Sequence, residues 1–552
     1  MSTAAKRALV NTRSKTETGF EYVLNQLQTY SAYGAKELRA FEPYRPGGEE
    51  ALRTRFDEMD LLLDFAGREP ALIDEVIKCL WESKEMSLTL ERSMNDTLSV
   101  VELFEVKTFL LRSGRIREIL ESTLLPGGGV IPERYKLYVT TDLLDVLDPS
   151  GERMDTFYLY DSFSADLAAL RKEKRELDLE LRKAQKMIRT RLEATHGFHM
   201  TPRFELIVPK ANKTLLALAS GLPELRRGEE DYMNVVFHLV PDDRVCEITA
   251  QAEKLASRIE DEEDKVRVKL TAEVAARKNL LAHNCGILGH IDVDLAKVLY
   301  ARAHDCVRPV IRDEHVIEIS EGRNLQVEDI LHEKGKPYCP VSISLRDGVT
   351  AITGANMGGK TVSIKMAGQA ALLAQYAMYV PAQKAEIGLS DFIQVLIGDS
   401  QNINRGLSSF GSEMEELKEI LDNAVSRSVI IIDEIASGTN PAEGLALTRA
   451  FMAYFQKKDY ITLFTTHFDH AAVGSDVCNL QVRGLAGADF GRLQRELTVA
   501  NRRQRIEILG KYMDYRLQRV DGEACAPRDA LNIAEILGVY DEIIDEARRN
   551  LL

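Results

Sequence analysis

The sequence lacks the marks of a secreted or membrane-spanning protein. Its seven cysteines are scattered and include no C-x-x-C pair, which argues against a disulfide framework and a zinc knuckle. The longest mostly apolar stretch, residues 367–380, is interrupted by Gln369 and Gln375 and is shorter than the ~20 residues of a membrane-spanning helix. The first residues, MSTAAKRALVNTRSK, contain no apolar signal core. We therefore expect a cytoplasmic protein.

Positive charge is also scarce. The chain has 71 Lys and Arg against 86 Asp and Glu, a net charge of −15. This acidity argues against a protein that coats nucleic acid by charge alone, and it leaves a local basic patch open. The 552 residues are 45% hydrophobic and 28% charged, the balance of a folded globular protein, with length for about three or four domains.

The N-terminal part, residues 1–160, is predicted to be a helical core with a small β segment. Apolar residues recur at helical spacing from residue 15 to about 125. Between residues 135 and 160 two apolar runs flank the turn sequence DPSG, which predicts a small hairpin or strand pair.

Residues 161–285 carry two long amphipathic patterns that predict a coiled-coil pair of antiparallel helices. Apolar side chains keep three-four spacing in each pattern: Leu167, Leu170, Leu177, Leu181 and Ile188 in the first, and Ile248, Ala252, Leu255, Ile259 and Val266 in the second. Short apolar runs between them, at about 200–240, predict a β-rich tip. The basic residues of this tip are matched by acidic ones, so that it is either a solvated surface or a patch that grips phosphate.

A glycine-rich loop follows a β-prone run and opens an apolar-periodic helix at residues 354–361. Its sequence, GANMGGKT, matches G-x-x-x-x-G-K-[ST], whose backbone N–H groups curl around a polyphosphate. Lys360 is expected to reach the β- and γ-phosphates, and the Thr361 hydroxyl is expected to hold Mg²⁺. The predicted nucleotide-binding residues are Gly354, Ala355, Asn356, Met357, Gly358, Gly359, Lys360, Thr361 and Val362.

Two carboxylates end the β-branched run VIIIDE at residues 429–434. Such a run is typical of a strand buried on both faces. It could simply enter a turn, but its place about seventy residues after the glycine-rich loop suits magnesium chemistry beside the phosphates. Asp433 is expected to orient the Mg²⁺ shell, and Glu434 is expected to act on the attacking water as general base.

Two further motifs have both a structural and a functional interpretation. His467 ends the apolar run ITLFTTH; it is either a surface or core histidine or a sensor of the γ-phosphate at the carboxyl end of a parallel strand. Ser408 lies in GLSSFGSEM before an amphipathic helix. It is either part of a capping motif or a γ-phosphate ligand for a second subunit.

These four motifs, GANMGGKT, LSSFGSEM, VIIIDEIASGTNPAEGLAL and TLFTTHFDH, resemble in order and spacing the ATPase domain of the MutS family, within the ABC class of nucleotidases. The resemblance implies a helical core with long lever helices and a C-terminal α/β P-loop ATPase domain. It implies a core return and linker at 286–345, an ATPase domain at 346–480 and a helical dimerisation segment at 481–552. Val362–Ser363 and the loop from Asn440 to Glu443 depart from the usual family sequences.

The resemblance also implies ATP and Mg²⁺ as cofactors, and a homodimer paired through the ATPase domains. Asn356 matches the family's distinctive P-loop asparagine, and Asn440 lies in the loop after the catalytic strand. The implied catalytic residues are Lys360, Ser408, Glu434 and His467, and the implied metal-binding residues are Thr361 and Asp433.

The sequence leaves open two hypotheses about the molecule on which the ATPase acts. In the first hypothesis a dimer closes around a DNA duplex or junction, as in repair or recombination, without a mismatch-reading domain of its own. In the second, the chain is an ATP-dependent reactivating chaperone for a cobalamin-dependent lysine or ornithine aminomutase, a resemblance of layout and of the run GFEYVLNQLQTYSAYGAKEL.

Overall fold

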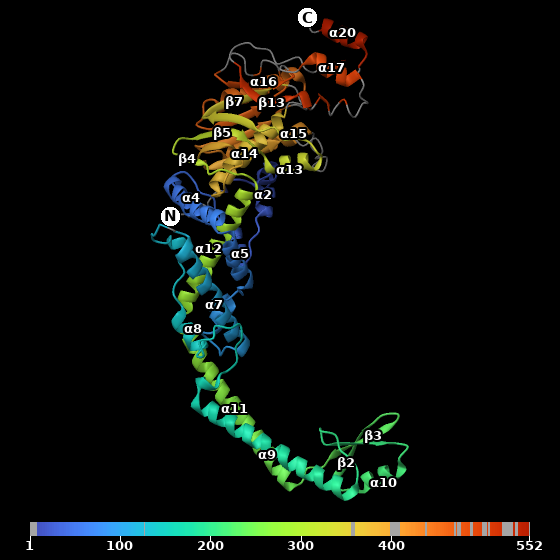
Figure 1. The fold of residues 1–552 in the computed structure, drawn as a ribbon. Helices are drawn as coiled ribbons and strands as arrows, with labels where there is room; N and C mark the ends of the chain where they lie inside the picture. The colour runs from blue at the N-terminus through green and yellow to red at the C-terminus, as the bar shows by residue number, and fades with distance from the viewer. Residues whose placement is uncertain are drawn as a thin grey trace. The chain divides into compact units, whose positions relative to one another are not determined.

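The computed structural model describes residues 8–125, 127–354, 359–397, 409–436, 439–468, 476–485, 489–498, 511–520 and 539–550, with short pieces at 471, 505, 508–509, 531 and 534–535. The chain divides into two compact units (Figure 1). Unit 1 comprises residues 1–81, 119–135 and 288–552, and unit 2 comprises residues 82–118 and 136–287. Among the described residues no helix is long and apolar enough to cross a membrane.

A six-stranded sheet organises the C-terminal part of unit 1. Its strand order is β13-β12-β7-β11-β10-β9, and only β13 runs antiparallel to its neighbour. The strands are β7 (Gly348–Thr353), β9 (Phe392–Ile397), β10 (Ser428–Asp433), β11 (Ile461–Thr465), β12 (Cys478–Gly484) and β13 (Asp514–Arg519). All six residues of β10 are buried, as the β-branched run predicts for a strand covered on both faces.

Helices cover both faces of this sheet. Ile431 and its neighbours Leu463 and Ile352 share one apolar core with α14 (Lys360–Gln375). Ile430 and Ile432 face the opposite core, which they share with α15 (Ser409–Asn423) and α16 (Pro441–Phe455). Alternate residues of one strand therefore face different helix layers, which is the layer arrangement of α/β domains.

A second sheet draws three of its strands largely from residues 286–345, expected to be a core return and linker, and the fourth from the expected ATPase domain. Its order is β4-β8-β5-β6, with β4 (Val310–Arg312), β5 (Val316–Gly322), β6 (Val341–Arg346) and β8 (Lys384–Gly388). Alternate residues of β5 and β6 are buried in the core shared with α14, while α13 (Leu325–Glu333) connects the two strands. The C-terminal segment, expected to be helical, contributes β12 and β13 to the large sheet besides α17 (Phe490–Thr498) and α20 (Asp541–Arg549).

The helices expected in the first 125 residues are present. Unit 1 contains α1 (Thr12–Glu17), α2 (Phe20–Gln26), α3 (Ala32–Ala40), α4 (Glu49–Arg68) and most of α5 (Pro70–Glu82), and unit 2 contains α6 (Ser87–Arg92). Two long helices, α7 (Val100–Thr123) and α12 (Lys278–Ala303), have residues in both units.

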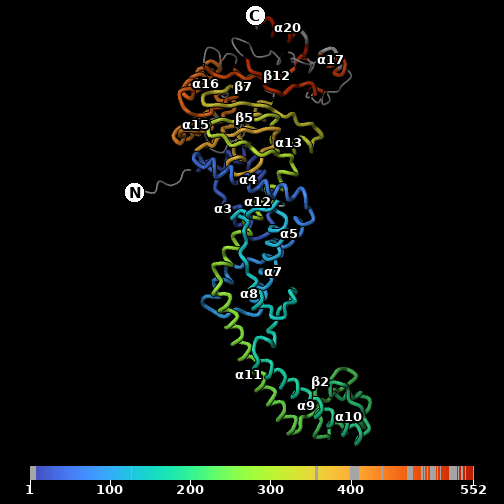
Figure 2. The backbone as a smooth tube through the Cα atoms, turned by 60° about the vertical axis from the view of Figure 1, so that its left-hand side comes forward, coloured from blue at the N-terminus to red at the C-terminus, as the bar shows by residue number. Residues whose placement is uncertain are grey.

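Unit 2 contains the predicted antiparallel helix pair, α9 (Ala165–His196) and α11 (Asp243–Ala276) (Figure 2). Arg171 near the start of α9 pairs with Glu263 late in α11, whereas Arg244 at the start of α11 pairs with Glu180 further along α9. The ion pairs thus run in opposite order along the two helices. Between them β1 (Glu205–Pro209), β3 (Asn234–Leu239) and β2 (Leu225–Glu230) form an antiparallel sheet in the order β1-β3-β2.

One local expectation is wrong. The strand pair expected between residues 135 and 160 is replaced by α8 (Thr141–Leu147), flanked by the 3₁₀ turns η1 (Glu133–Tyr135) and η2 (Asp161–Phe163). The buried Leu143, Leu144 and Leu147 have the spacing of one helical face, which outweighs the strand pattern. The predicted β-rich tip contains α10 (Lys213–Gly221) besides its three strands; α10 begins after Asn212, whose side chain accepts a hydrogen bond from Leu215 N.

Candidate functional site

The glycine-rich loop joins the central strand β7 to helix α14. Its described glycines, Gly354 and Gly359, have φ angles of 129° and 74°, a region that favours glycine. A Cβ atom on Gly359 would also lie 2.9 Å from the ring of Tyr515 in β13. The sequence therefore needs glycine at this position for both the backbone and the packing. Residues 355–358, which include the predicted ligands Ala355, Asn356, Met357 and Gly358, lie outside the described residues.

Lys360 is buried at the start of α14, with 3% of its surface exposed. Its Nζ donates a hydrogen bond to Gly354 O at 2.7 Å and lies 3.2 Å from Glu434 Oε1. A buried ammonium is stable only when it has such partners. Two predicted site residues, one in the glycine-rich motif and one about seventy residues later in the chain, are thus brought into direct contact.

Asp433 joins the glycine-rich loop to the neighbouring strand. Its Oδ2 accepts a hydrogen bond from Thr361 Oγ1 at 2.8 Å, and its Oδ1 accepts one from the hydroxyl of Thr465. A hydroxyl and a carboxylate at this position fit Mg²⁺, which prefers oxygen ligands and takes the rest from phosphates and water. Within the described ranges no group of three or more His, Cys, Asp or Glu is placed so that it could hold a metal ion.

Thr465 is a site residue that the sequence analysis missed. Besides its bond to Asp433, its Oγ1 accepts a hydrogen bond from Glu434 N at 3.0 Å, and its carbonyl oxygen lies 3.2 Å from the same N–H. Thr465 ends β11, which lies between β7 and β10 in the sheet. The sequence did contain a signal for this residue: a hydroxyl side chain at the end of an apolar run that was itself predicted to be a buried strand parallel to β7 and β10.

The backbone after β10 is held in a strained form. Glu434 and Ala436 have φ angles of 47° and 59°, which are uncommon for residues other than glycine. Ala436 N donates a hydrogen bond to Glu413 Oε1 of α15 at 3.1 Å. Burial raises the pKa of Glu413, and this hydrogen bond opposes the shift. The position of Glu434 therefore depends on α15 as well as on its own strand.

The remaining predicted residues are less closely joined to this cluster. His467 follows β11, is exposed, and has its ring centroid 4.3 Å from that of Phe468, so its role as γ-phosphate sensor stays a prediction. Asn440 caps α16 by accepting a hydrogen bond from Ala442 N at 2.9 Å. Val362 is half-buried in the first turn of α14. Ser408 lies outside the described residues.

The cluster formed by Lys360, Thr361, Asp433 and Glu434 lies at the carboxyl ends of parallel strands, where open α/β sheets bind ligands. It combines a cation and a helix N-terminus, which favour a polyphosphate, with an oxygen pair for Mg²⁺ and a carboxylate that can accept a proton. Such a set suits hydrolysis of a nucleoside triphosphate.

Comparisons with known proteins show what this chain is similar to. Residues 350–551 match the family described as MutS domain V. The chain is 27% identical over 487 residues to the DNA mismatch repair protein MutS of Salinibacter ruber, covering 84% of this chain and 51% of that protein. It is 30% identical over 292 residues to an endonuclease MutS2 of Clostridium botulinum, covering 52% of this chain and 34% of that protein. The chain thus spans about half the length of the first relative and about a third of the second.

Proposed function

We propose that this chain, which belongs to the MutS family, is an ATP hydrolase that couples ATP binding and hydrolysis to a clamp-like conformational change on DNA. The observation that carries the proposal is the contact of Lys360 with Glu434 beside the Thr361–Asp433 pair. These four side chains supply the phosphate-binding, metal-orienting and proton-accepting groups that hydrolysis requires.

In the proposed reaction Lys360 exchanges its contact with Glu434 for the β- and γ-phosphates of ATP. The freed Glu434 carboxylate accepts a proton from water as the water oxygen attacks the γ-phosphorus, and the bond to the ADP oxygen breaks. Thr361 and Asp433 would hold Mg²⁺, which would supply positive charge beside the phosphates. The partner subunit's Ser408 contacts the γ-phosphate across a homodimer, and phosphate release reopens the pair.

DNA is the client that the relatives favour, because their names refer to DNA mismatch repair and to an endonuclease. The relatives give no support to the aminomutase alternative. The balanced charge of the tip argues against binding of DNA by the tip. There Arg227 pairs with Glu230 at 2.7 Å, and Lys210 lies 3.8 Å from the same residue.

A basic surface is found instead on the outer face of α9. This helix has nine basic and six acidic residues, a net charge of 9 − 6 = +3, whereas α11 has six basic and nine acidic residues, a net charge of 6 − 9 = −3. Exposed cations on α9 recur at helical spacing opposite its buried leucines: Lys172, Arg175, Arg182, Lys183 and Lys186. They extend over about 21 Å of helix, the length of roughly six phosphates along one DNA strand.

A groove beside this face supports the same interpretation. It has a volume of about 720 Å³, and its basic lining residues are Lys183, Lys186, Arg191 and Arg244. Asp242 also lines it, and Arg244 is paired with Glu180, so the groove is basic without being uniformly so. Phosphate contacts of this kind position a protein on DNA without reading its sequence.

The test is ATP turnover by the purified chain with and without Mg²⁺ and duplex or branched DNA at low salt. We expect magnesium-dependent hydrolysis that DNA stimulates. In the variant K172Q/K183Q/K186Q of α9, the stimulation should fall at least tenfold and its salt dependence should become shallower. The matched variant K254Q/R258Q/K269Q removes three exposed cations from α11 and should keep the stimulation. Hydrolysis without any response to DNA would exclude the DNA proposal.

A further inference from the structure

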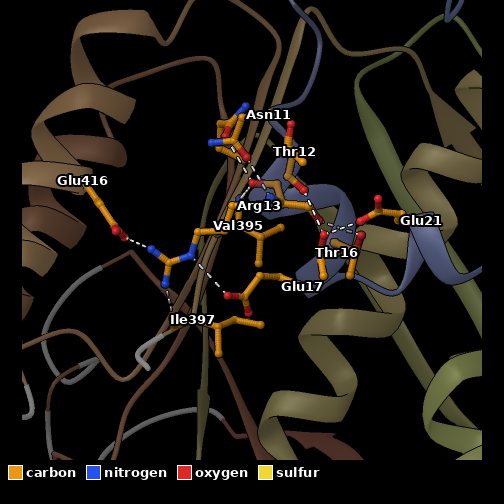
Figure 3. A network of polar contacts seen from close by, with 12 residues as sticks. Asn11, Thr12, Arg13, Thr16, Glu17, Glu21, Val395, Ile397 and Glu416 are labelled. Atoms are coloured by element: carbon orange, nitrogen blue, oxygen red, sulfur yellow. Dashed lines mark hydrogen bonds and ion pairs between the residues drawn. The ribbon is translucent and has the colours of Figure 1, made fainter. Parts of the chain in front are cut away.

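The N-terminal segment of unit 1 lies along the outer edge of the large sheet, at β9 (Figure 3). Leu9 O accepts a hydrogen bond from Ile393 N at 2.8 Å, and the buried Ser14 Oγ accepts one from Val395 N at 2.9 Å. Ser14 Oγ also lies 3.1 Å from Gln394 Oε1. The segment thus satisfies backbone groups that an edge strand would otherwise expose.

Arg13 extends this contact from β9 to a neighbouring helix. Its Nη2 donates to Ile397 O, the last carbonyl of β9, at 3.0 Å, and its guanidinium pairs with Glu416 of α15. Its Nε lies 3.2 Å from Glu17 Oε1 in its own helix (Figure 3). The planar guanidinium has donors in a fixed fork, so a single arginine can hold three partners that a lysine could not hold together.

Helix α15 is attached in turn to the backbone behind the proposed general base. Glu413, one turn before Glu416, accepts the hydrogen bond from Ala436 N, two residues after Glu434. The negative charge of Glu416 also raises the pKa of Glu413, so the two carboxylates interact. Arg13 supplies the positive charge that offsets Glu416. A continuous series of contacts therefore leads from the N-terminal helix through α15 to the strained turn at Glu434.

We propose that Arg13 is a positioning residue for hydrolysis: it holds α15 in place on the end of β9, and α15 holds the turn that presents Glu434. The proposal rests on the ATP hydrolase function given above. It concerns the hydrolytic step more than ATP binding, because Lys360 and Thr361 belong to α14 and Arg13 contacts β9 and α15.

The first test is steady-state kinetics of Arg13→Gln. We expect kcat to fall five- to twentyfold while KM for ATP stays within twofold of the wild type. Arg13→Lys should recover little of this loss, because one ammonium cannot reach both Ile397 O and Glu416. Glu416→Gln should lower kcat similarly, and the double variant R13Q/E416Q should lose little more than either single variant, since both act through one contact.

The chain offers a matched control in Arg53. Its side chain is 32% exposed against 33% for Arg13, it donates to the strand carbonyl Ile311 O at 2.9 Å, and it pairs with Glu50 and Asp313. These contacts belong to the smaller sheet, away from the turn at Glu434. Arg53→Gln should therefore leave kcat within twofold of the wild type. An unchanged kcat in Arg13→Gln, or equal losses in both variants, would overturn the proposal.

Hydrogen exchange separates this proposal from the proposed function. Amides of α15 should exchange several-fold faster in Arg13→Gln than in the wild type, and unchanged exchange would overturn the anchoring role. A wild type that binds no ATP or does not hydrolyse it would instead contradict the ATP hydrolase function, whatever the exchange rates show.

Discussion

A buried lysine lies at each end of helix α14, one in the helix itself and one in α12, and the two lysines have different partners. At the first residue of the helix, Lys360 contacts Gly354 O and the carboxylate of Glu434. Just beyond the last turn, Lys297 of α12 donates to Tyr376 O at 2.8 Å and lies 3.8 Å from the ring centroid of Phe41. Both side chains are almost fully buried.

The helix dipole and the partners explain the difference. The positive end of α14 favours an anion, and Lys360 adds to it a cation whose carboxylate partner can be exchanged for phosphate. The negative end favours a cation, but Lys297 has a carbonyl and an aromatic ring in place of a close carboxylate. Burial and, to a smaller extent, the charge of Arg55 therefore lower the pKa of Lys297 to about 7, against the opposing effects of Asp294 and Glu37. One end is suited to exchanging partners and the other to fixing the helix.

The largest effect is expected from Lys360→Ala. Loss of the ammonium removes the phosphate partner and leaves Glu434 without its counterion, so ATP affinity should fall by about 3–5 kcal/mol, roughly two to four decades in Kd. Equilibrium titration with a fluorescent ATP analogue measures this. Lys297→Met is the control at the other end of α14 and should keep ATP affinity within about threefold; a similar loss in both variants would break the comparison.

Glu434→Gln should separate binding from hydrolysis at the same end. The amide keeps the size of the side chain but cannot accept a proton from water, so kcat should fall by about two decades while ATP still binds. Single-turnover hydrolysis and size-exclusion chromatography with ATP are the measurements, and we expect an ATP-stabilised dimer. Hydrolysis at the wild-type rate would show that Glu434 is not the general base.

Sequence motifs predicted the site at the N-terminal end of α14, but they could not predict the contacts of the buried lysine at its other end. The glycine-rich loop and the run VIIIDE identify strand ends, and parallel strands bring those ends together, which is why Lys360, Thr361, Asp433 and Glu434 meet. Lys297 lies 79 residues from Tyr376 in sequence, and nothing in its local pattern indicates that partner. The second sheet escaped prediction for the same reason, since β8 follows α14 in the chain and yet pairs with β4 and β5.

A smaller effect is expected from a substitution of Thr465, which belongs to the cluster at the N-terminal end of α14. Thr465→Val keeps the shape of the side chain but removes the hydroxyl that contacts both Asp433 and Glu434 N. We expect kcat to fall by about tenfold, since an unsatisfied buried carboxylate oxygen costs roughly 1–3 kcal/mol. Thr465→Ser keeps the hydroxyl and should retain most of the activity; equal losses in the two variants would assign the effect to packing instead.

The prediction with the smallest expected effect on ATP binding and hydrolysis concerns stability alone, through the pH dependence of Lys297. Its folded-state pKa of about 7 lies below that of an unfolded lysine, so between these values the unfolded chain binds more protons than the folded one. The free energy of unfolding should therefore rise with pH above about 7, and the full cost of the buried charge should be present below it. Lys297→Met removes this titration, so its stability relative to the wild type should fall by about 2 kcal/mol between pH 7 and pH 9 in urea unfolding. If the difference in stability between the two proteins stayed constant over that range, Lys297 would keep its charge up to pH 9. The two buried lysines would then differ only in whether their partners can be exchanged.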